Sequence, residues 1–157
     1  MESRAFRNAM GRFATGVTVI TTNANKEVHG MTANAFMSVS LDPKLITVSI
    51  DNRANMLNKI NCSGKFAVNV LSDLQQDISM HFAGQAKKYD EIPFAMFYDV
   101  PIIQGSLASV VCEVDRTYVV GDHTLFIGSV VDALLTEGNP LTFYGGKYGK
   151  YQPAEYV

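Results

Sequence analysis

The sequence predicts a mainly β protein, a small closed barrel of six or seven strands with a few helices around it. Three observations support this fold class. Strand-like segments recur at the spacing of hairpins, polar turns separate them, and helical patterns occur only at intervals. A chain of 157 residues is long enough for one domain, which we expect to span residues 1–157, and for a sizeable core.

The first half of the chain is predicted to hold one helix and then three strands. The helix is expected because Phe6, Met10 and Phe13 recur at helical spacing and Ser3 can cap its start. The strands are expected because apolar and polar residues alternate between polar turns, with the second strand interrupted near Asn34. In order, the helix covers 3–13 and the strands cover 16–22, 28–40 and 45–50.

The second half is predicted to contain two helices, three strands and a short aromatic end. Met56, Leu57 and Ile60 lie on one side of the first of these helices, and Ser72 can cap the second. Residues 83–100 are expected to be irregular, with an exposed loop or short helix at 87–90. In order, the elements are a helix at 52–61, a strand at 66–71, a helix at 72–79, strands at 102–120 and 125–135, and the end at 141–151.

Composition argues against several classes of partner. The net charge of −2 with no basic stripe makes nucleic acid an unsuitable partner. No apolar run reaches the roughly 18 residues of a membrane span, and no apolar signal region follows the first residues, so we expect a cytoplasmic protein. With 47% hydrophobic and 18% charged residues, some apolar surface is expected to be buried between subunits.

Motifs for metal or nucleotide chemistry are also missing. The three His and two Cys residues show no metal-ligand spacing, so no metal site is expected. Cys62 and Cys112 lie far apart and are expected to be small buried thiols. The sequence has no G-x-G-x-x-G stretch, so a Rossmann nicotinamide enzyme is not supported.

The segment from residue 30 to 40 carries small and hydroxyl-bearing side chains where a strand normally carries large apolar ones. Such side chains leave the backbone N–H and C=O groups open to a flat polar ligand, such as an isoalloxazine ring. A strand with a polar face would explain the same composition. The candidate residues of this segment are Thr32, Ala33, Asn34, Ala35 and Ser38.

A second candidate segment lies where a predicted strand runs into the start of a helix. Exposed N–H groups and the helix dipole favour an anion at such a place. Arg53 would add charge-assisted hydrogen bonds to phosphate, although Asp51 can equally be a simple helix cap. The candidate residues are Ser49, Ile50, Asp51, Asn52 and Arg53.

Three shorter features could belong to the same site. Ala83 and Gly84 beside Phe82 would let the backbone approach a ring, or they simply end a helix. His123 follows a Gly-Asp turn and could hydrogen-bond a second substrate near neutral pH, or face solvent. Tyr148 lies in a Gly- and Tyr-rich tail that forms either a mobile flap or a terminal strand.

These segments, in this order, resemble the flavin reductase family with the FMN-binding split barrel. The matching stretches are 6–22 (FRNAMGRFATGVTVITT), 29–36 (HGMTANAF) and 121–128 (GDHTLFIG). Each stretch alone is a weak signal, but three at these separations are specific, and the likeness extends from about residue 4 to 150. The resemblance is strongest to the small reductase components of two-component aromatic hydroxylases, such as those for phenol and 4-hydroxyphenylacetate.

The resemblance implies a six-stranded antiparallel Greek-key split barrel with flanking helices, working as a homodimer. It implies hydride transfer from NADH, or NADPH, to FMN or FAD, with the reduced flavin supplied to a separate flavin-dependent monooxygenase. Residues 32–35 match the segment along the isoalloxazine, 49–53 the ribityl and phosphate segment, and 82–84 a further flavin contact. His123 matches the position that contacts nicotinamide, where we assign it a positioning role, and Tyr148 belongs to a tail near that site.

Two rival functions remain open at this point. A flavin-binding protein without turnover, serving as an electron carrier or flavin store, would use the same pocket. A structural dimerisation module would carry a degenerate pocket. NADH oxidation with added flavin separates the enzyme from the first rival, and a flavin-dependent thermal shift separates it from the second.

Overall fold

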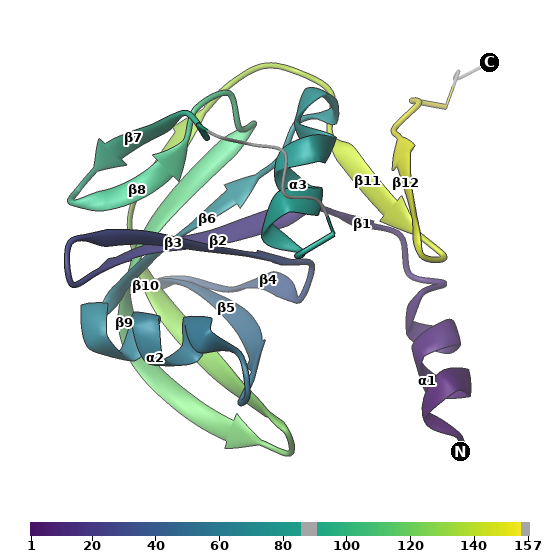
Figure 1. Cartoon of the computed structure of the whole chain (residues 1–157), viewed down its shortest axis with the longest axis horizontal. Helices are drawn as coiled ribbons and strands as arrows, with labels where there is room; N and C mark the ends of the chain where they lie inside the picture. Colours follow the sequence, from purple (N-terminus) through teal and green to yellow (C-terminus); the bar gives the residue numbers. More distant parts are fainter. Residues whose placement is uncertain (86–90, 155–157) are drawn as a thin grey trace.

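The computed structural model describes residues 1–85 and 91–154, and β-structure dominates it (Figure 1). The prediction of a mainly β fold with few helices is confirmed. The elements in chain order are α1 Ser3–Met10, β1 Thr15–Gly16, β2 Thr18–Ala24, β3 Glu27–Ala33, β4 Phe36–Leu41, β5 Lys44–Asp51, α2 Asn55–Ser63, β6 Lys65–Val70, the 3-10 helix η1 Asp73–Gln75, α3 Gln76–Phe82, β7 Phe94–Phe97, β8 Val100–Ile103, β9 Ala108–Val120, β10 His123–Leu135, β11 Leu141–Tyr144 and β12 Lys147–Lys150.

The main sheet has seven antiparallel strands in the order β3-β2-β6-β9-β10-β5-β4. Its edge strands, β3 and β4, are consecutive in the chain, and only Asn34 and Ala35 lie between them. The three Cα steps from Ala33 to Phe36 span at most about 11 Å, whereas a flat sheet of seven strands would separate its edges by about 29 Å. The sheet therefore curls until its two edges meet at this link.

The expected interruption of the second strand near Asn34 is thus confirmed, and it is the point where the curled sheet stays open. Within the described residues, β3 and β4 form no ladder with each other, so the closed barrel expected from the strand spacing is not observed. The link is attached to β5 instead, through a hydrogen bond from the Ser49 amide to the Ala35 carbonyl (3.0 Å). The seven strands of this sheet do not confirm the six-stranded count that the resemblance implies.

Two smaller sheets lie beside the main one. The strands β1, β11 and β12 form a sheet in which Thr15 pairs with Phe143, so the C-terminal hairpin lies next to the start of the chain (Figure 1). The strands β7 and β8 form a hairpin, which corrects the prediction that 83–100 is irregular. Its turn residues Tyr98 and Asp99 both have positive φ (52° and 64°), and neither is the glycine that usually marks such a turn. The loop or helix expected at 87–90 lies outside the described residues.

The core fills the inside of the curled sheet. On β5 the alternation is clear, because Ile46, Val48 and Ile50 face the core while the residues between them face outward. Phe66 lies over Gly128, where an added Cβ would stand only 2.7 Å from the Phe66 ring. The two thiols were expected to be buried, but only Cys112 is, and burial raises the pKa of its thiol to about 12; Cys62 is exposed on α2.

The helices cover the periphery of the sheet. Among the described residues, no helix is long and apolar enough to cross a membrane. The first, α1, ends at Met10 rather than at 13 and has no buried residue, and it stands away from the sheet beside the β11–β12 hairpin (Figure 1). Its N-cap is Glu2, not Ser3, and no side chain caps it. The predicted cap at Ser72 is confirmed as a capping box with Gln75, which starts η1 and leads into α3.

A buried amide joins strands of two sheets. The fully buried Asn69 on β6 donates to the Val19 carbonyl (3.0 Å) and to the Thr21 hydroxyl (2.9 Å). Its side-chain oxygen accepts from the Ile103 amide (2.9 Å) and from the Ser109 hydroxyl (2.9 Å). Because these partners lie on β2, β8 and β9, this side chain helps to fix how the β7–β8 hairpin sits on the main sheet.

Replacing Asn69 by Ala is expected to lower the free energy of unfolding by about 2–4 kcal/mol, because it leaves several buried polar groups without a partner. Urea denaturation followed by circular dichroism measures the change. Asn58→Ala, at an exposed position on α2, is the matched control and should change stability by less than about 0.5 kcal/mol. Equal stability of the two variants would show that the Asn69 cluster does not hold the sheets together.

Candidate functional site

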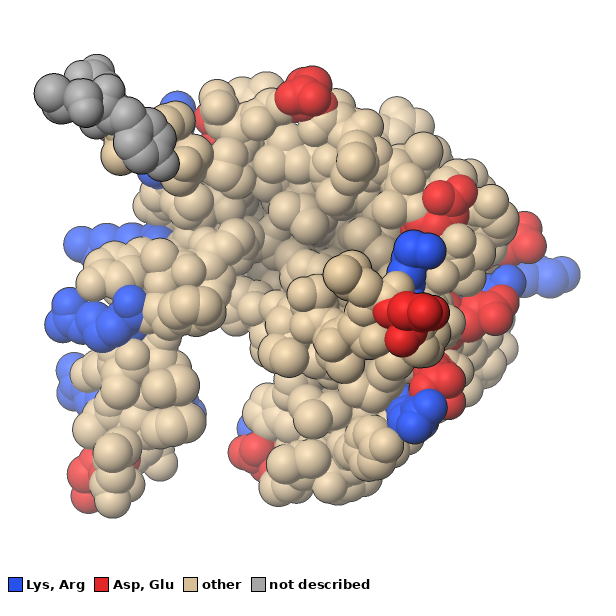
Figure 2. Space-filling model, turned by 180° about the vertical axis from the view of Figure 1, so that it is seen from behind, with Lys and Arg blue, Asp and Glu red and all other residues tan. Residues whose placement is uncertain are grey.

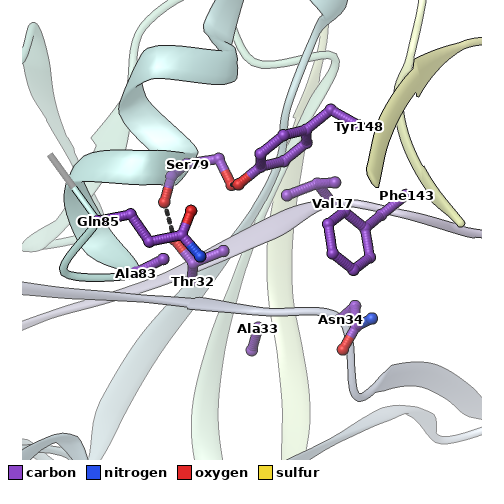
Figure 3. A pocket seen from close by; sticks show the side chains of 9 residues that line it. All are labelled: Val17, Thr32, Ala33, Asn34, Ser79, Ala83, Gln85, Phe143 and Tyr148. Atoms are coloured by element: carbon purple, nitrogen blue, oxygen red, sulfur yellow. Dashed lines mark hydrogen bonds between the residues drawn. The ribbon is translucent and has the colours of Figure 1, made fainter. Parts of the chain in front are cut away.

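Two adjoining hollows lie on the open side of the curled sheet. The smaller, which we call the inner pocket, has a volume of about 150 Å³ and lies between β3, α3 and the β11–β12 hairpin (Figure 3). The larger, the arm cleft, has a volume of about 1450 Å³ and lies between α1 and the outer face of the sheet; a deep hollow is visible there in Figure 2. The inner pocket is lined by Val17, Thr32, Ala33, Asn34, Ser79, Ala83, Gln85, Phe143 and Tyr148.

The two hollows are parts of one site. Asn34 and Phe143 line both of them. Ligand pockets commonly have volumes of about 300–1,000 Å³, so the inner pocket alone holds only part of a molecule of cofactor size. A larger ligand would have to extend from the inner pocket, past these two shared residues, into the arm cleft.

Hydrogen bonds between three elements fix the shape of the inner pocket. The Thr32 hydroxyl on β3 donates to the Ser79 carbonyl on α3 (2.7 Å; Figure 3). The Ser79 hydroxyl in turn lies 2.8 Å from the Tyr148 hydroxyl on β12. Tyr148 also meets the Phe143 ring edge to face, with 5.2 Å between ring centres. The aromatic wall of the C-terminal hairpin is therefore attached to the helix across the pocket.

The residues of the predicted contact segment 82–84 have different surroundings in the structure. Ala83 lines the inner pocket, whereas Phe82 packs on Gly30, where an added Cβ would stand 2.4 Å from its ring. Gly84 has φ +71° and follows the end of α3. Glycine at position 30 is thus what allows the Phe82 ring to lie directly on β3 beside the pocket.

The predicted segment 32–38 lies mostly in the site. Thr32 and Ala33 line the inner pocket, Asn34 lines both hollows, and Ala35 lines the arm cleft. Asn34 is exposed and its amide donates to the Thr15 hydroxyl at 3.4 Å. Ser38 lies on β4 next to an irregularity in its pairing with β5, is exposed, and lines neither hollow.

Residues 49–53 extend from the arm cleft to the far end of β5. Ser49 lines the cleft, and the Ile50 side chain is buried in the core, so only its backbone can face a ligand. Arg53 holds both carboxylate oxygens of Asp51 (3.1 and 2.7 Å), and this pairing holds the pKa of the Asp51 carboxyl well below its usual range. Asn52 accepts a hydrogen bond from the Thr124 hydroxyl (2.7 Å), which joins this loop to the β9–β10 hairpin.

His123 lies at the start of β10, directly opposite Asp51 of β5. Its Nδ1 atom is 2.7 Å from a carboxylate oxygen of Asp122, and the imidazole lowers the pKa of that carboxyl. His123 lines neither hollow, but Leu125, two residues further along the same face of β10, lines the arm cleft. The structure therefore separates the two predicted nicotinamide contacts, since Tyr148 lines the inner pocket and His123 lies beyond the cleft.

Sequence reasoning missed several residues that line the site. Phe143 enters the inner pocket because β11 pairs with β1, a contact between the two ends of the chain that no local pattern reveals. Thr47 lines the arm cleft, and the period-two alternation of β5, which places it on the outward face with Ser49, could have identified it. Arg7 and Arg12 also line the cleft, next to Lys147 of the tail, a lysine that the sequence had already suggested could meet a phosphate.

The lining fits a flat ring with polar edges. Ala33 and Ala83 leave space in the inner pocket, and within the described residues the 34–35 link is bonded to a strand on its β5 side only. In the arm cleft, the buried hydroxyl oxygen of Thr47 has no hydrogen-bond partner among the described residues. An unpaired buried hydroxyl is costly, and this one belongs to a residue that lines the cleft.

The comparison with known proteins identifies the family. A family profile described as "Flavin reductase like domain" matches residues 10–152. An NADH-dependent flavin reductase from Rhodococcus sp is 45% identical over 145 residues, which cover 90% of this chain and 82% of that protein. The reductase component of 4-hydroxyphenylacetate 3-monooxygenase from Thermus thermophilus is 37% identical over 145 residues, covering 92% of this chain and 93% of that protein.

A solved structure supports the same assignment. The structure of the flavin reductase PheA2 in its native state superposes with a TM-score of 0.95 at 55% sequence identity, covering 98% of this chain and 100% of that one. The match therefore includes both the curled sheet and the elements around the two hollows. This chain belongs to the family of flavin reductase-like domains.

Proposed function

We propose that this protein is an NADH-dependent flavin reductase that transfers a hydride from NADH to FMN or FAD and supplies the reduced flavin to a separate flavin-dependent monooxygenase. The observation that carries the proposal is the site at the open seam of the sheet, where small side chains and uncovered backbone adjoin a cleft of cofactor size. Its relatives support it: one is named an NADH-dependent flavin reductase, and another is the reductase component of a monooxygenase.

The chain's own residues bind and orient in this proposal. Bound flavin supplies the hydride acceptor, so the reaction needs no nucleophile from the protein. Thr32, Ala33, Asn34 and Ala35 offer their backbone and small side chains to the ring, with Ser38, Phe82, Ala83 and Gly84 completing the predicted contacts. On the other side of the inner pocket, Phe143 and Tyr148 exclude water from the reacting atoms.

Residues 49–53 hold the ribityl chain and phosphate in this proposal. Arg53 retains capacity for an anion although it is paired with Asp51. Its guanidinium has five N–H donors, of which the pair uses two, and its side chain is 87% exposed. For His123, the contact of Nδ1 with Asp122 leaves Nε2 available to position the nicotinamide.

The proposed assembly is a homodimer of single-domain subunits over 1–157, located in the cytoplasm. Phe6, Met10 and Phe13 are 55%, 57% and 78% exposed on and just after α1, a helix with no buried residue. An apolar surface of this kind favours burial against a second copy.

For the fold, we propose that β2, β3, β5, β6, β9 and β10 form the six-stranded Greek-key split barrel, with β4 as an additional edge.

NADH oxidation should depend on added flavin. Purified protein with NADH and FMN, FAD or riboflavin, compared side by side, is expected to consume NADH with multiple turnovers for at least one flavin. Absorbance at the reduced-nicotinamide band measures the rate. A protein that binds flavin but never consumes NADH would be a flavin carrier or store, and one that shows no flavin-dependent thermal shift would have a degenerate pocket.

Replacing His123 by Ala should raise KM for NADH by about tenfold, the value of a lost hydrogen bond of about 1.4 kcal/mol, while changing the flavin Kd less. Steady-state kinetics and flavin fluorescence quenching measure the two effects. Thr117→Ala, exposed on the same β9–β10 hairpin, is the control and should change neither. Equal losses of NADH and flavin affinity would refute the positioning role of His123.

Replacing Arg53 by Ala should weaken FMN binding by about tenfold at low salt, because a charge-assisted contact to phosphate is lost. The difference from the wild type should shrink as ionic strength rises, since the side chain is exposed and its interaction is screened. Riboflavin lacks the phosphate, so its Kd should not change. Lys44→Ala, another exposed cation, is the control. An unchanged FMN Kd in Arg53→Ala would show that the phosphate does not bind at this loop.

A further inference from the structure

Ser79 is a fully buried serine in the middle of α3 whose hydroxyl is bonded outside its own helix. A serine inside a helix often returns its hydroxyl to the carbonyl four residues earlier, or turns it to solvent. Here the Ser79 hydroxyl lies 2.8 Å from the Tyr148 hydroxyl, 69 residues further along the chain. Figure 3 shows the two side chains pointing toward one another at one side of the inner pocket. The buried hydroxyl is therefore satisfied by the C-terminal hairpin.

Ser79 contacts both walls of the inner pocket through different atoms. Its backbone carbonyl accepts a hydrogen bond from Thr32 on β3 (2.7 Å), and its hydroxyl meets Tyr148 on β12. The neighbouring Ile78 is buried in a core cluster with Leu71, so α3 is held in place independently of the Ser79 hydroxyl. Removing this hydroxyl would release the Tyr148 wall, whereas the bond from Thr32 to the backbone would remain.

The bond to Ser79 fixes where the hydroxyl end of Tyr148 lies. The strand β12 is at an edge of its sheet and pairs with β11 alone. Among the described residues, the contact with Ser79 is the only side-chain hydrogen bond made from β12. The Tyr148 ring also packs edge to face on Phe143, with 5.2 Å between ring centres. Packing restrains the ring, but the polar end of a buried tyrosine is fixed by its hydrogen-bond partner.

We infer that Ser79 is a positioning residue whose hydroxyl sets the place of Tyr148 and, through it, the pose of the nicotinamide of NADH. This role rests on the proposed function and deepens it, because Tyr148 is the predicted nicotinamide contact that lines the inner pocket. The pocket volume of about 150 Å³ is that of a cavity that holds one benzene-sized ring. Since the reacting atoms must lie about 3–3.5 Å apart, a small displacement of this wall is enough to slow hydride transfer.

Ser79→Ala, Tyr148→Phe and the double variant form a mutant cycle around this hydrogen bond. Both single variants remove the same bond, so we expect kcat/KM for NADH at saturating flavin to fall about tenfold in each. The double variant should lose no more than the more affected single variant. The Kd of flavin, measured by fluorescence quenching without NADH, should change less than about twofold. A merely structural role of Ser79 would weaken flavin binding as well.

Ser106→Ala and Tyr98→Phe are the matched controls and should keep the wild-type kcat/KM. Ser106 is buried with no partner for its hydroxyl among the described residues, the Tyr98 hydroxyl donates to Asp132 (3.1 Å), and neither residue lines a hollow. A wild-type kcat/KM in Ser79→Ala, losses that multiply in the double variant, or an equal loss of flavin affinity would overturn the role of Ser79. Failure of the proposed function is distinguishable, because the wild type itself would then not oxidise NADH.

Discussion

The two-residue link between β3 and β4 is the constraint on which the rest of the structure depends. Because Asn34 and Ala35 must connect opposite edges of a seven-stranded sheet, the sheet cannot be flat, and its edges are brought within about 11 Å of each other. The curl places the apolar faces of β5 and β10 inside, where Val48 and Phe126 are fully buried. It also leaves the link itself without a complete set of strand neighbours, so the same constraint produces both the core and the opening at which the site lies.

The opening becomes a site because small residues surround it. Gly30 allows the Phe82 ring to lie against β3, and this position of α3 in turn places Ser79 where its carbonyl accepts from Thr32 and its hydroxyl meets Tyr148. A larger side chain at position 30 would push α3 outward and separate these groups. The close approach of a helix to a strand therefore determines the width of the inner pocket, and the C-terminal hairpin closes it from the other side.

The sequence allowed prediction of the features that arise from local patterns. Alternation identified β5, and a run of small residues identified Thr32, Ala33 and Asn34 as part of the site. The β7–β8 hairpin was missed because its turn has Tyr98 and Asp99 at positive φ, where local rules expect glycine. Arg7 and Arg12 were missed for another reason, since they come near the tail only through the contact between Gly11 and Gly145. Residues 32–35 and 49 could thus be placed from sequence, whereas the wall of the cleft depends on contacts between the two ends of the chain.

That wall is attached to the main sheet through its β11–β12 part, where Leu141 is buried in a core cluster with Leu71. The two-residue strand β1 pairs with β11, the Leu141 amide donates to the Leu71 carbonyl (3.1 Å), and Tyr148 meets Ser79. Against this, α1 contributes no buried side chain. Segments with few buried contacts open at a lower free energy than the core. The α1 side of the wall can therefore move without disturbing the Asn69 cluster or the buried Phe66 and Phe126, and such movement is what a site needs if it admits one ring onto another and then releases a product as large as a flavin.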